Sequence, residues 1–108
     1  MKVKTGEAKG TVLNYLVGKI RGLDRYFFLE NGCDLSMMRG VYEPSANWSV
    51  GGPIVEREKI TLEWTGENWM AYIRHDEEYF GPTPLVAAMR VYAASKLGEE
   101  VEVPDELA

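Results

Sequence analysis

The chain has 108 residues, of which 45% are hydrophobic and 27% charged, and its formal net charge is -5. These values are typical of one globular domain spanning residues 1–108, and no apolar run approaches the ~20 residues that cross a bilayer. A single cysteine and a single histidine exclude a disulfide framework and the common zinc clusters, and we expect a cytoplasmic protein without cofactor or metal.

The first segment alternates enough to predict a strand over residues 1–4. Thr5 is then expected to cap a helix that ends at Gly22, because apolar residues recur at helical spacing between them. That core stripe consists of Val12, Leu13, Leu16, Val17 and Ile20. The opposite face is small and nearly uncharged, and consists of Thr11, Asn14, Tyr15 and Gly18.

Basic residues concentrate at the beginning of the chain, where residues 1–25 hold Lys2, Lys4, Lys9, Lys19, Arg21 and Arg25. Such asymmetry can mark a nucleic-acid interface. Projected on a helix, however, Lys19 and Arg21 fall on opposite flanks of the apolar stripe, with Lys9 near its middle. Affinity for a phosphate backbone needs several cations on one side, so the pattern argues against nucleic-acid binding, which stays open as a third hypothesis.

Residues 23–53 contain a predicted buried strand at Tyr26–Leu29 and a turn signal at Asn31-Gly32. A long connection with several glycines and prolines follows. A connection of this length in a small domain is either functional or contains a further element.

A β-hairpin is predicted from Ile60–Trp64 and Trp69–Arg74, which are separated by a Gly-Glu-Asn turn. The first strand is expected to direct Ile60, Leu62 and Trp64 to one face. The second strand is apolar on both sides, so we expect the long loop or a partner to cover its outer face.

The clearest element is a helix over residues 84–97, with Thr83 as cap, Pro84 as first residue and Gly98 after its end. One side carries large apolar residues and the other small ones, so the helix is expected to be buried on two sides, against the long loop, the first helix or another subunit. With a short strand near Val101 and Val103, the sequence predicts an α+β fold in which a small, mostly antiparallel sheet packs against two helices.

Gly51 and Gly52 suggest a phosphate-binding loop, but the lysine, hydroxyl and glycine register of such loops is missing. We interpret them as a corner, with Pro53 opening a short helix. A small-ligand or peptide groove beside Trp48 is the alternative interpretation.

Two other groups of residues contain side chains that could act in catalysis or metal binding. Cys33 and His75 could form a nucleophile and base, but no third orienting group is recognisable. The run from His75 to Glu78 could bind a divalent metal, although it lacks the spacing of a known loop. A packed cysteine and a solvated charge run are favoured, so no catalytic residue and no metal ligand is predicted.

Arg90 stands among apolar residues in the predicted helix. Its guanidinium is expected to cross an apolar surface and pair with Glu56 or Glu58. That ion pair would join the two Gly-Pro turns as a clasp.

The segments NWSVGGPIVERE and GPTPLVAAMRVYAASKLGEEVEVPDEL, with MKVKTGE before them, resemble the NinX-like family of small bacteriophage and prophage proteins. The resemblance implies a phage-encoded cytoplasmic protein, in many phages encoded among early genes. It implies no catalytic residues, because the family has no established function. The chain departs from the family pattern at Asn47, where we expect Asp, and at Lys59, where we expect Gly.

We therefore expect a non-enzymatic accessory protein that binds an unidentified host or phage protein and can form a homodimer. The alternative is a small-ligand-binding protein or minor hydrolase. The groove predicted for a ligand or partner consists of Asn47, Trp48, Gly51, Gly52, Arg57, Thr83 and Arg90.

Overall fold

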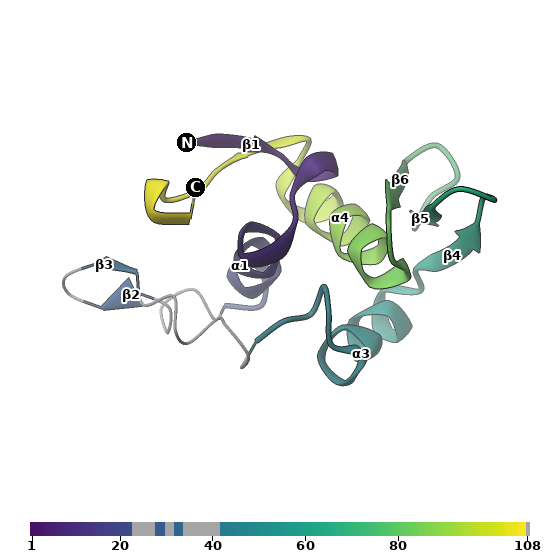
Figure 1. Ribbon diagram of the computed structural model, residues 1–108, viewed down its shortest axis with the longest axis horizontal. Coiled ribbons are helices and arrows are strands. Elements are labelled where there is room, and N and C mark those ends of the chain that lie inside the picture. The colour runs from purple at the N-terminus through teal and green to yellow at the C-terminus, as the bar shows by residue number, and fades with distance from the viewer. Residues whose placement is uncertain (23–27, 30–31, 34–41, 108) are drawn as a thin grey trace.

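The computed structural model describes residues 1–22, 28–29, 32–33 and 42–107 (Figure 1). These residues form the predicted α+β fold. The helices are α1 (Gly10–Ile20), α3 (Trp48–Glu58) and α4 (Pro84–Leu97), with short 3-10 turns η1 (Thr5–Glu7) and η3 (Asp105–Leu107). The strands are β1 (Lys2–Lys4), β2 (Phe28–Leu29), β3 (Gly32–Cys33), β4 (Thr61–Trp64), β5 (Trp69–Tyr72), β6 (Glu78–Gly81) and β7 (Glu100–Glu102).

Helix α4 lies at the centre of the fold, between the three-stranded sheet β4-β5-β6 and the layer that contains α1 and η1 (Figure 1). Thr83 caps the helix by accepting a hydrogen bond from the amide of Val86 at 3.1 Å. A Cβ atom on Gly81 would lie 2.7 Å from the amide nitrogen of Ala87, so β6 rests directly on the helix. Both apolar sides of α4 are therefore covered within the chain, by the sheet and by the first helix.

Thr5 does not cap α1, in contrast to the prediction. The helix begins at Gly10, and Lys9 precedes it without a side-chain capping bond. The fully buried Thr5 hydroxyl instead donates to the carbonyl oxygens of Gly98 at 2.9 Å and Glu99 at 3.2 Å. Its role is to tie the beginning of the chain to the end of α4.

The small face of α1 is buried as well, by a contact that the sequence analysis did not predict. Asn14 and Tyr15 are both buried there. The Asn14 side-chain oxygen accepts hydrogen bonds from the Ser45 amide at 3.1 Å and the Ser45 hydroxyl at 2.7 Å. The turn that contains Ser45 therefore covers this face, and one amide group satisfies the polar groups that are buried with it.

The predicted corner at residues 51–53 is wrong, because α3 runs through it. The helix begins at Trp48, where the Asn47 side chain accepts from the Ser49 amide at 3.0 Å. A residue before proline is normally kept out of the helical region by its Cβ atom, and Gly52 has none. The helix can therefore continue through Pro53.

Lys59 ends α3 in the left-handed conformation, with φ 55° and ψ 47°, at the position where the family resemblance leads us to expect glycine. This conformation is costly for a residue with a Cβ atom. We expect Lys59→Gly to raise the free energy of unfolding by about 1 kcal/mol in urea denaturation. Lys59→Ala keeps the Cβ atom and is the matched control; an equal gain in both variants would contradict the backbone explanation.

The predicted hairpin is confirmed by the pairing of β4 with β5, in which Leu62 faces Ala71 and Trp64 faces Trp69. The sequence interpretation missed β6, which pairs with the other side of β5. The predicted solvated charge run extends to Glu78, whereas this residue begins β6. The neighbouring Tyr79-Phe80 pair, typical of strands, was the available signal.

The described residues also contain two short sheets of two strands each. The predicted first strand is β1, which pairs antiparallel with β7. Of the predicted strand Tyr26–Leu29, Phe28 and Leu29 form β2, which pairs with β3. Tyr26, Phe27 and Asn31 lie outside the residues that the structure describes.

Candidate functional site

The outer face of the three-stranded sheet carries apolar and aromatic side chains. In the register of β5 and β6, Met70 lies opposite Phe80. Neighbouring residues of a strand face opposite sides, and Gly81 packs onto α4, so Met70 and Phe80 point away from that helix. Phe80 is 43% exposed, and Met70 and Tyr72 are half-buried. The long loop was expected to cover this face, but none of its described residues buries Phe80.

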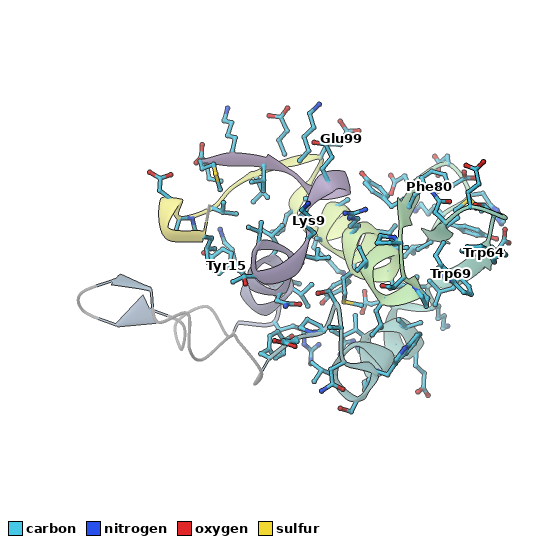
Figure 2. The ribbon with its side chains drawn as sticks, viewed as in Figure 1. Lys9, Tyr15, Trp64, Trp69, Phe80 and Glu99 are labelled. Atoms are coloured by element: carbon cyan, nitrogen blue, oxygen red, sulfur yellow. The ribbon has the colours of Figure 1, made fainter. Side chains whose placement is uncertain are left out.

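A second exposed aromatic ring lies in the adjacent row of the sheet, which contains Trp69 and Gly81 and therefore belongs to the opposite face. Trp64, on the edge strand β4, is 56% exposed and packs its ring against Trp69 with ring centroids 5.5 Å apart. Figure 2 shows Trp64, Trp69 and Phe80 at the same end of the molecule, distant from Lys9 and Tyr15. We call Met70, Tyr72 and Phe80, together with Trp64 on the opposite face at the same end of the sheet, the sheet surface.

Tyr72 of the sheet surface contacts two polar side chains. The Tyr72 hydroxyl donates to a carboxylate oxygen of Glu63 at 3.0 Å, and this hydrogen bond raises the pKa of the Tyr72 phenol. The His75 ring lies 4.7 Å from the Tyr72 ring. The Cys33 side chain lies outside the described part of the chain, so the structure does not test the disfavoured pairing of Cys33 with His75.

Arg90 does not form the predicted ion pair. Its Nε donates to the Ala8 carbonyl at 2.8 Å, and its Nη1 donates to the Phe80 carbonyl at 2.7 Å. Partial burial lowers the pKa of the guanidinium, an effect that the charge of Glu7 opposes. Arg90 therefore joins η1, α4 and β6.

The carboxylates that were expected to meet Arg90 lie elsewhere. Glu58 pairs with Arg57 at 3.1 Å and with Lys96 at 3.6 Å, and no ion pair joins Glu56 to Arg90. The predicted clasp between the two Gly-Pro segments is thus wrong. Contact between them comes instead from packing, because Gly51 lies against Leu85.

The residues predicted to form a ligand or partner groove fall into two separate groups. Asn47, Trp48, Gly51, Gly52 and Arg57 lie on or next to α3, and Gly51 brings this helix close to the start of α4, which Thr83 caps. Arg90 instead lines an open cavity of about 390 Å³, together with residues such as Glu67, Phe80 and Pro82.

No residue of α3 lines the cavity at Arg90. Trp48 is 52% exposed on its own helix. Arg90 and Trp48 therefore do not share one cavity, and ligand binding by the α3 group stays a prediction.

Within residues 1–22 and 42–107 and the two short described strands, no three His, Cys, Asp or Glu side chains converge as a metal site. The helices among those residues are all too short or too polar to cross a membrane.

Comparison with known protein families gives a match. The family model described as Bacteriophage P22, NinX matches residues 4–96, which is well over half of the chain. No curated protein matches it. The matched range contains α1, α3, β4–β6 and nearly all of α4, and therefore the whole sheet surface.

Proposed function

The chain belongs to the NinX family of bacteriophage proteins, and from this premise we propose that it is an accessory protein that binds another protein of the phage or its host. We place this action in the bacterial cytoplasm and propose binding without catalysis. Arg90, the arginine first considered for a ligand, supports that view because its guanidinium is engaged by two backbone carbonyls.

The observation that carries the proposal is the exposure of Trp64 and Phe80, on the two faces of one end of the sheet. Exposed clusters of large apolar residues mark interaction sites, and tryptophan and tyrosine dominate the binding energy of protein interfaces. Helix α4 cannot provide the interface, because its two apolar sides are buried within the chain.

The tagged chain is first used for affinity capture from phage-infected cells, and the captured protein is then purified. The experiment compares the affinity of that protein for two variants, Trp64→Ala/Phe80→Ala and Trp48→Ala. Trp48 is equally exposed and belongs to the alternative site on α3. We expect the double substitution to weaken binding at least about tenfold, as loss of interface anchors does, and Trp48→Ala to leave it unchanged.

The reverse pattern would place the interface on α3 and contradict the sheet surface. Thermal denaturation provides the control, because both variants remove exposed rings and should unfold at similar temperatures. A second copy of the chain is the remaining alternative partner. Light scattering distinguishes self-association from binding to another protein. We expect the 12.2 kDa mass of one chain. A mass twice as large, which returns to that of one chain in the Trp64→Ala/Phe80→Ala variant, would assign the surface to self-association.

A further inference from the structure

Strand β1 leaves one backbone edge free. Met1 and Val103 exchange hydrogen bonds, with the Val103 amide donating to the Met1 carbonyl at 2.8 Å and the Met1 nitrogen donating back at 3.1 Å. Backbone groups of an antiparallel strand point alternately to either side, so Lys2 and Lys4 direct their N–H and C=O groups away from β7. The Lys4 carbonyl is used by η1, for which Lys4 is the N-cap. No described residue pairs with the Lys2 groups or the Lys4 amide, since β1 and β7 form a two-stranded sheet.

An open groove of about 480 Å³ runs along this edge, between β1 and the start of α1. Its lining includes the half-buried Val3 and Val12 and the buried Ala8. Three exposed lysines and one exposed glutamate complete the lining, and these are Lys2, Lys4, Lys9 and Glu7. The groove therefore combines an apolar floor with a net positive rim, on a chain whose net charge is -5.

The occupied edge of β1 shows what chemistry fits this strand. There, β7 has the sequence Glu-Val-Glu and lies against Lys-Val-Lys, with Lys2 opposite Glu102, Lys4 opposite Glu100 and Val3 opposite Val101. A segment on the free edge would meet the same three side chains of β1. Opposite charges directly across two strands stabilise the pair, and like charges destabilise it.

We propose that the free edge of β1 binds an extended segment of a partner protein by antiparallel strand addition. The segment alternates carboxylate and aliphatic residues. Its backbone pairs with Lys2 and Lys4, its carboxylates lie beside the lysines, and its aliphatic side chain enters the groove beside Val3. Main-chain hydrogen bonds supply affinity in this binding mode, and alternate side chains supply specificity.

A second copy of the chain does not fit the free edge. Two β1 edges would place lysine against lysine, and two β7 edges would place glutamate against glutamate. Pairing of β1 with the β7 of another copy satisfies the charges, but it is a head-to-tail contact that forms open chains unless the rotation closes.

Nucleic acid fits less well, because the groove has an apolar floor and contains Glu7 among its cations. A phosphate backbone also offers only hydrogen-bond acceptors, so it cannot pair with the alternating donors and acceptors of a strand edge. Displacement of the bound segment by a short DNA duplex at physiological salt is therefore an outcome that would overturn the proposal.

The probe is the capped peptide EVEVEVE, added to the 15N-labelled full chain and followed by NMR and amide hydrogen exchange. We expect shifts at the Lys2 and Lys4 amides, and exchange at both amides slowed at least about tenfold at saturation, because free edge amides are exposed to water. Shifts centred on Phe80 or absent at β1 would overturn the proposal. The proposed function rests on the sheet surface and this proposal rests on β1. A negative result at one of these two sites therefore does not contradict the proposal for the other.

Matched peptides test the pairing itself. In an antiparallel pair with Lys2 and Lys4, the peptide's glutamate amides face β1 and its valine amides face away. N-methylation of the glutamates should weaken binding at least about tenfold by removing hydrogen bonds, whereas N-methylation of the valines should not. Equal effects of the two modifications would overturn strand addition.

Charge is tested with Lys9→Glu, which lies outside β1 and leaves the β1–β7 pairing intact. It should weaken EVEVEVE binding at least about threefold, in line with a surface ion pair. The reversed peptide KVKVKVK should not bind the wild-type chain, and binding equal to that of EVEVEVE would contradict the charge argument.

Discussion

Replacement of Arg90 by alanine is expected to lower the free energy of unfolding by about 2–4 kcal/mol, the range for losing charge-assisted hydrogen bonds and exposing their partners. The guanidinium holds the carbonyls of Ala8 and Phe80, which are 82 and 10 residues away in sequence. The bond to Phe80 is exposed, so water can replace part of it. Urea denaturation of the full chain measures the loss.

Two further variants separate hydrogen bonding from charge. Arg90→Lys keeps the charge but not the planar fork that reaches both carbonyls, so we expect an intermediate loss. Arg57→Ala removes an exposed arginine that is paired with its neighbour Glu58 and should not change stability measurably. A loss in Arg90→Ala no larger than in Arg57→Ala would contradict the role of Arg90 in joining the three elements.

Arg90 also shows where prediction from sequence reaches its limit. Its position among apolar residues correctly indicates a side chain that crosses an apolar surface. Its partners are backbone carbonyls, which every residue has, so the sequence offers no chemical signal for them. The predicted partners are the carboxylates of Glu56 and Glu58, whereas tertiary packing places the carbonyls of Ala8 and Phe80 within reach.

Elements with strong local signals were predicted well. Thr83, Pro84 and Gly98 bracket α4 as capping rules require, and alternation identifies the β4–β5 hairpin. The double apolar pattern of β5 predicted that the long loop or a partner covers its outer face, but no described residue of the loop buries Phe80. Phe80, which completes the sheet surface, was not predicted there, because the four-residue strand β6 was hidden beside a run of charges.

The basic groove at β1 illustrates a different limit. Projection on a helix compares only the residues of that helix, and it correctly separates Lys19 and Arg21 from one another. Lys2 and Lys4 belong to the strand β1 and share the groove with Lys9. Strand β1 pairs with β7, nearly 100 residues later in the chain. Long-range pairing of this kind is set by the whole fold.

Replacement of Gly51 by alanine is expected to destabilise the chain by about 2 kcal/mol or more, because overpacking outweighs the ~1 kcal/mol by which alanine favours a helix. A Cβ atom at this position would lie 2.8 Å from Cδ2 of Leu85 and in closer conflict with the carbonyl oxygen of Pro44. The Leu85 side chain can move, but the Pro44 carbonyl belongs to a buried turn. The φ of Gly51 is not in the left-handed region. Glycine is therefore required here because the Pro44 carbonyl and the Leu85 side chain approach its Cα closely.

The adjacent Gly52 provides the matched control within the same helix. A Cβ atom there would meet only Cε3 of Trp48 at 3.6 Å, an ordinary contact. The helix gain of alanine is offset because the residue precedes Pro53, so we expect Gly52→Ala to change stability by no more than about 0.5 kcal/mol. Thermal and urea denaturation of both variants measure the contrast. Equal losses at the two positions would show that the Gly-Gly-Pro segment acts through backbone flexibility, and that α3 does not depend on its contact with Pro44.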